Sequence, residues 1–146
     1  MVGEDPLVEF NRQELVGWLV RSGWEINNTL ANDIAAKIPN DDRTKPYITD
    51  GNQVLKSQIQ NFRAATDEVT LDLLVERGFD VPVSKVIDTY TSQINLNDKS
   101  KFTMALETDP EIQKYKNLVP SSDFDGFKKN VERVLVKVKA DEKIKP

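Results

Sequence analysis

Apolar side chains recur along this chain at the three- and four-residue spacing that places them on one face of an α-helix. The first stripe runs from Leu15 to Leu19, after a capping sequence at Asn11, and ends at Gly23. A second stripe, from Leu30 to Ile38, stops at Pro39. These signals predict two short helices joined by a glycine turn.

The middle of the chain predicts three further helices. We expect them over about residues 53–65, 66–77 and 82–94, where apolar residues again follow helical spacing. The preceding stretch, residues 39–52, is polar and rich in turn-forming residues, so we expect a loop there.

The last third predicts two short helical segments and one long helix. The long helix carries an apolar stripe from Phe124 to Val138, although its VLVKV sequence also has the β propensity of a strand. We therefore expect an all-α protein, a compact bundle of about six to seven short helices in one domain spanning residues 1–146. Its expected parts are a hairpin-containing body over about 8–97, a C-terminal helical segment over about 98–139 and a frayed tail over 140–146.

One sequence pattern occurs twice. Residues 18–26 read WLVRSGWEI and residues 73–81, 55 positions later, read LLVERGFDV. One interpretation is a duplication that gives two related helical hairpins. The other is that any helix ended by a glycine cap needs a glycine followed by an apolar residue. The sequence leaves both open.

Composition excludes several classes of site. The chain has no histidine and no cysteine, so it cannot build a Ser-His-Asp triad, a thiol nucleophile or a thiolate metal site from its own residues. The loop carboxylates, Asp41-Asp42 and Asp50, lack the spacing of a calcium loop, and Glu68, Asp72 and Glu76 read as one exposed helix face. We expect no catalytic, cofactor-binding or metal-binding residues.

The ends of the chain and its hydropathy bear on location. No apolar stretch approaches the ~20 residues of a membrane span, and the first residues are acidic where a signal peptide would be basic. We expect a cytoplasmic protein without a membrane partner.

The first helix carries more apolar residues than one buried face needs. Val16 and Val20 lie off its main stripe, and Trp18 and Trp24 are large. These four residues are our candidates for a surface that binds another protein or a second copy, although tryptophans at helical spacing are commonly core residues.

A second set of candidates would contact nucleic acid or an acidic partner. It comprises Ser84, Lys85 and Thr89 on the second hairpin, and Lys128, Lys129, Arg133 and Lys137 on the last helix. The net charge of −4 disfavours a broad phosphate-binding face. We therefore expect a small non-enzymatic interaction or regulatory module that binds another protein or itself. The alternative is a nucleic-acid-binding regulator that uses the helix-turn-helix-like hairpin or the basic helix.

Overall fold

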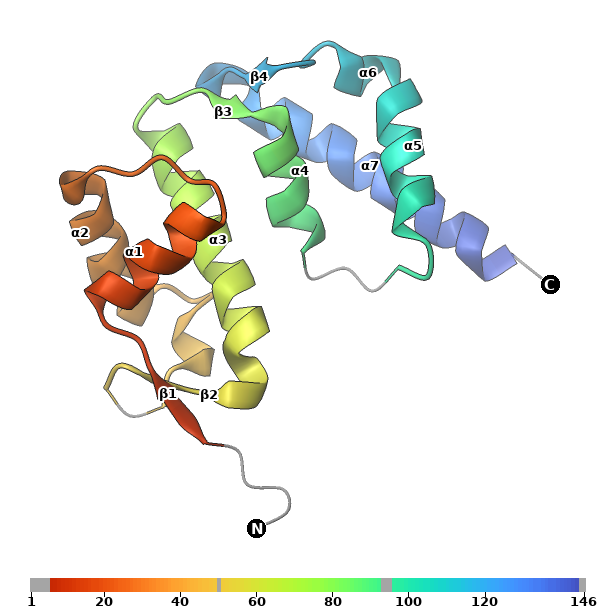
Figure 1. Ribbon diagram of the computed structural model, residues 1–146. Helices are drawn as coiled ribbons and strands as arrows, with labels where there is room; N and C mark the ends of the chain where they lie inside the picture. The colour runs from red at the N-terminus through yellow and green to blue at the C-terminus, as the bar shows by residue number, and fades with distance from the viewer. Residues whose placement is uncertain (1–5, 50, 93–95, 145–146) are drawn as a thin grey trace. The chain divides into compact units, whose positions relative to one another are not determined.

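The computed structural model describes residues 6–49, 51–92 and 96–144. These residues form seven α-helices, which confirms the predicted all-α class, and two short two-stranded sheets that were not predicted (Figure 1). The chain divides into two compact units: unit 1 is Met1–Leu73 and unit 2 is Leu74–Pro146. The division falls inside a single helix, α3 (Ile59–Glu76), and the single-domain organisation stays a prediction.

Two capped helices open unit 1. Helix α1 (Arg12–Arg21) follows Asn11, whose side chain accepts a hydrogen bond from the Glu14 N–H at 2.9 Å, as its sequence predicts. Helix α2 (Asn28–Lys37) is capped in the same way by Asn27, which accepts from the Leu30 N–H at 2.8 Å.

A small sheet joins two segments of unit 1 that are far apart in the sequence. Strand β1 (Leu7–Glu9) pairs antiparallel with β2 (Gln53–Leu55), and Val8 lies opposite Val54. The prediction of helix from residue 53 is therefore wrong. Val54 is buried by pairing with a strand about 45 residues away along the chain, and local apolar spacing carries no information about such a partner.

Helix α3 is one helix where the sequence predicted two. We expected a new helix to begin at Thr66 or Asp67, but Thr66 does not cap. Its buried hydroxyl donates to the Phe62 carbonyl one turn earlier at 2.9 Å, and Thr70 donates to the Thr66 carbonyl in the same way. These threonines lie in the helix interior, so the predicted break is absent.

The core of unit 1 is built around Phe62, which is fully buried. The Phe10 ring centroid lies 4.7 Å from that of Phe62, and the Trp18 ring meets Phe62 edge-on at 5.9 Å. The predicted stripes of the first two helices supply Leu15, Leu19, Leu30 and Ile34 to the same core.

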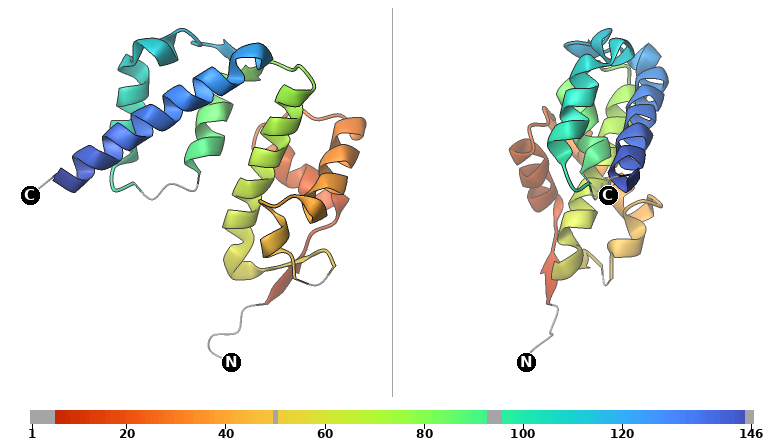
Figure 2. Two further views of the ribbon diagram at one scale, coloured as in Figure 1. Left: turned by 180° about the vertical axis from the view of Figure 1, so that it is seen from behind. Right: turned by 90° about the vertical axis from the view of Figure 1, so that its right-hand side faces the viewer.

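Unit 2 consists of four helices after the end of α3. They are α4 (Val83–Thr91), α5 (Lys99–Thr108), α6 (Pro110–Gln113) and α7 (Phe124–Ile144). The α4 stripe was predicted to extend to Ile94, which lies outside the described residues. Helices α5 and α6 pack against α7, and α5 lies beside α7 and crosses it obliquely (Figure 2).

The VLVKV sequence is helical and lies within α7. The helix continues to Ile144, into the stretch where we expected a frayed tail. Its buried side chains follow the predicted spacing: they are Phe124, Phe127, Val131, Val134 and Val138. A second short sheet, β3 (Val81–Pro82) with β4 (Leu118–Val119), joins the start of α4 to the segment before α7.

The repeated sequence pattern has the same backbone structure in both copies. Gly23 and Gly78 have positive φ angles of 92° and 84°, a conformation that glycine adopts without steric cost. In each copy the following aromatic residue donates its N–H to a carbonyl five residues earlier, as in a Schellman cap. The next helices, α2 and α4, both begin five residues after the glycine.

The side chains after the two glycines differ. Trp24 is 5% exposed, whereas Phe79 is 50% exposed. The matching positions of Trp24 and Phe79 in the two sequence patterns predict the same role for both residues. This prediction holds for the backbone and is wrong for the side chain.

Candidate functional site

The two tryptophans predicted to face a partner are buried. Trp18 is 7% exposed, and the Arg63 guanidinium lies 4.6 Å from the centroid of its ring. The Trp24 indole N–H donates to an Asp67 carboxylate oxygen at 2.9 Å, which ties the glycine turn to α3. Both side chains stabilise unit 1 and offer no surface to a partner in this conformation.

The two valines predicted with them are more accessible. Val16 is half-buried and Val20 is 55% exposed. Singly exposed valines are ordinary on a protein surface, so these residues do not by themselves define a binding patch.

The candidates on α4 do not share one exposed face. Ser84 is exposed, Lys85 is half-buried, and Thr89 is 3% exposed. The Thr89 hydroxyl donates to the Lys85 carbonyl at 2.7 Å, so it is satisfied within its own helix. A recognition surface made of all three residues is therefore not presented.

The cations predicted on α7 are divided between two roles. Lys128 places its ammonium 5.0 Å from the centroid of the Tyr90 ring, and Arg133 forms an ion pair with Asp109 at 2.8 Å. Lys129 and Lys137 are exposed. The charge available for a phosphate contact is thus smaller than the sequence indicates.

Asp109 links this ion pair to the start of α6. Its carboxylate accepts hydrogen bonds from the N–H groups of Glu111 and Ile112, at 3.0 and 3.1 Å, and so caps that helix. Burial opposes ionisation, but the hydrogen bonds from Arg133 and Ile112 outweigh it, so the pKa of Asp109 lies below its ordinary value of 3.8. The pairing is structural.

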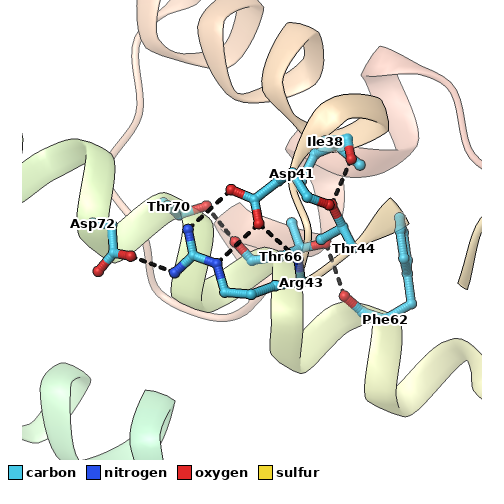
Figure 3. Close-up of polar contacts among 8 residues, drawn as sticks. All are labelled: Ile38, Asp41, Arg43, Thr44, Phe62, Thr66, Thr70 and Asp72. Atoms are coloured by element: carbon cyan, nitrogen blue, oxygen red, sulfur yellow. Dashed lines mark hydrogen bonds and ion pairs between the residues drawn. The ribbon is translucent and has the colours of Figure 1, made fainter. Parts of the chain in front are cut away.

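Asp41, one of the loop carboxylates of unit 1, belongs to a second ion-pair cluster (Figure 3). The Arg43 guanidinium donates to both Asp41 carboxylate oxygens, at 2.9 and 3.0 Å, and also to Asp72 on α3. The hydrogen bond from Arg43 lowers the pKa of Asp41 below 3.8 despite partial burial, and the carboxylates raise the pKa of Arg43. This cluster fastens the loop after α2 to α3.

No described residues form a group of three or more carboxylates close enough to hold a metal ion. In the same part of the chain, no helix is both long and apolar enough to cross a membrane. Neither observation points to a site.

The strongest candidate site is a groove in unit 2 with a volume of about 570 Å³. Apolar side chains from three helices form its floor: Val83 and Ile87 of α4, Leu106 of α5 and Ile112 of α6. Leu106 and Ile112 are nearly fully buried, whereas the two α4 residues are half-buried and expose apolar surface to the groove.

Polar residues surround this floor. The rim includes Ser84, Asp88, Thr103, Glu107 and Lys116. A smaller hollow of about 290 Å³ adjoins the groove, shares Ile87, Asp88 and Thr103 with it, and reaches Leu96 and Phe102. We call the larger hollow the unit 2 groove. Its apolar floor and polar rim are typical of a surface that binds a ligand or a partner.

Sequence reasoning identified one residue of this groove, Ser84. Val83, Val86 and Ile87 lie at i, i+3 and i+4 on one apolar stripe of α4, where Val86 is fully buried and the other two line the groove. The spacing gives no signal that separates the groove-lining residues from the core residue.

Comparison of the chain with protein-family models, with curated protein sequences and with solved structures gave no match.

Proposed function

We propose that this chain is a non-enzymatic protein-interaction module and that the unit 2 groove receives the partner. The observation that carries the proposal is the apolar floor between α4 and the α5–α6 segment, open to solvent and bordered by polar side chains. Covering such a floor removes apolar surface from water at roughly 25 cal/mol per Å² before the costs of association.

The burial of the floor residues indicates that the groove exists before a partner binds. Leu106 and Ile112 are held in the packing of α5 and α6 against α7, so a partner need not create the hollow by displacing core side chains. The volume of about 570 Å³ suits the insertion of a few apolar side chains.

The test begins with selection of binding peptides from a displayed random library on the full-length chain. Methyl NMR then locates the binding site of an enriched peptide. We expect shifts for the methyl groups of Val83, Ile87, Leu106 and Ile112. The methyl groups of Val136, which is 67% exposed on α7, are the control and stay unmoved.

A pair of adjacent substitutions separates the groove from the rest of α5. Thr103→Arg fills the groove, whereas Met104→Arg adds the same charge at a position that is 63% exposed and does not line it. We expect Thr103→Arg to abolish peptide binding and Met104→Arg to retain it. Equal effects of the two substitutions, or peptides that shift other methyl groups, would overturn the proposal.

Light scattering of the free chain addresses self-association. A molecular mass that increases with protein concentration, and that Thr103→Arg returns to the monomer value, would identify the partner as a second copy. A constant monomeric mass assigns the groove to another protein.

A further inference from the structure

The charges around the unit 2 groove indicate what kind of segment fits it. We propose that the groove binds a short amphipathic helix that places a lysine or arginine between apolar side chains. This inference rests on the proposed function and adds the conformation and charge of the partner segment.

The lining of the groove favours a helical partner. The lining residues of α4 and α5 are helical, so they offer no strand edge to an extended peptide. An extended segment over the apolar floor would leave its own N–H and C=O groups without partners. A helix satisfies these groups internally and presents apolar side chains along one face.

The length of the two hollows together agrees with a short helix. The α4 residues that line the groove run from Val83 to Asp88, and those that line the adjoining hollow continue to Thr91. This stretch of α4 corresponds to about 12 Å along the helix axis at 1.5 Å per residue. A partner helix of about two turns therefore matches the length of the lined surface.

Two carboxylates on opposite walls supply the charge preference. Asp88 on α4 lines both hollows, and Glu107 on α5 lines the larger one. Among the described residues, neither carboxylate has an ion pair or a side-chain hydrogen bond. A bound helix would displace water from both carboxylates, which costs free energy. A lysine or arginine at the solvent-facing edge of that helix would offset the cost by pairing with them.

Two lysines limit this preference. Lys116, which follows α6, lines the groove, and Lys99 lines the adjoining hollow, so each disfavours a cation on the part of the partner next to it. The partner's cation is therefore expected beside Asp88 and Glu107 and away from both lysines.

The experiment uses the selected peptides, each about 16 residues long, and the full-length chain. We expect enriched sequences to carry apolar residues at helical spacing with one lysine or arginine among them. The double variant Asp88→Asn/Glu107→Gln should weaken their binding by about fivefold, as expected when one cation loses its attraction to two exposed carboxylates. Glu132→Gln, an exposed α7 residue outside the groove lining, is the matched control and should leave binding unchanged.

The peptide supplies the complementary test. Replacing its cation by glutamine should weaken binding to the native chain and remove the difference between the native chain and the double variant. Peptides that shift the groove methyl groups but show no cation preference would overturn this inference and leave the proposed function standing. Extended peptides that bind in the groove would overturn it as well. Absence of any groove binder would overturn both.

Discussion

Trp24 and Phe79 follow matching glycine turns, but only Trp24 is buried and hydrogen-bonded to a neighbouring helix. Trp24→Ala should lower the free energy of unfolding by about 3–5 kcal/mol because it leaves a cavity in the core of unit 1. Phe79→Ala should cost less than about 1 kcal/mol because half of the ring is already in water. Urea unfolding followed by far-UV circular dichroism measures both. Equal losses would contradict the different burial of the two rings.

The Asp41–Arg43 pair makes stability depend on pH in a defined direction. Because the pKa of Asp41 is lowered in the folded chain, its contribution is fully present above the ordinary value of 3.8 and is lost as pH falls through the lower folded pKa. We expect the free energy of unfolding to decrease below about pH 4. Asp41→Asn should lower stability at pH 7 by about 1–2 kcal/mol and make the acid-side decrease smaller.

Asp42, which is exposed, provides the control for this pH series. Asp42→Asn should follow the native pH profile. An Asp41→Asn profile that matches the native one in slope would show that the ion pair does not contribute.

At the scale of elements, the two glycine turns require backbone conformations that other residues adopt at a cost. Gly78→Ala should destabilise the chain by about 1–2 kcal/mol because φ is 84° at this position. Gly17→Ala, inside α1, should stabilise it by up to about 1 kcal/mol. The added methyl group at Gly17 would meet only the flexible Arg21 side chain, at 3.6 Å. Thermal unfolding measures both, and a stabilising Gly78→Ala would contradict the cap.

Elements that depend on neighbouring residues could be predicted from the sequence. The cap at Asn11 and the turns at Gly23 and Gly78 form as expected, because each depends on contacts within a few residues. The small sheets could not be predicted, because their strands have two or three residues and pair across long stretches of chain.

Helix α3 was misread for a different reason. A threonine before acidic residues is a common start signal, but in α3 the same hydroxyl bonds back to the Phe62 carbonyl. Which of the two bonds forms depends on burial of the threonine, and burial is a tertiary property.

The groove could not be predicted because it too depends on tertiary contacts. Its floor comes from α4, α5 and α6, and no spacing within one helix reveals that these segments lie together.

At the scale of the molecule, charge bears on the alternative of nucleic-acid binding. The chain carries a net charge of −4, and Arg133 is paired with Asp109. We therefore expect no mobility shift of DNA or RNA oligonucleotides at low ionic strength, where electrostatic affinity is greatest. A shift that weakens with added salt and is lost in Lys129→Glu/Lys137→Glu would contradict this expectation and favour the basic face of α7.

The burial of Trp18 and Trp24 has a practical consequence. These are the chain's two tryptophans, and both belong to unit 1, while α4 to α7 belong to unit 2. Indole emission is therefore an intrinsic optical label for one half of the chain, whereas far-UV ellipticity reports helix in both halves. Coincident melting curves from the two signals would mean that one cooperative transition covers the whole chain. Separate curves would mean that the two units unfold independently. Tryptophan emission would then distinguish them without an added dye.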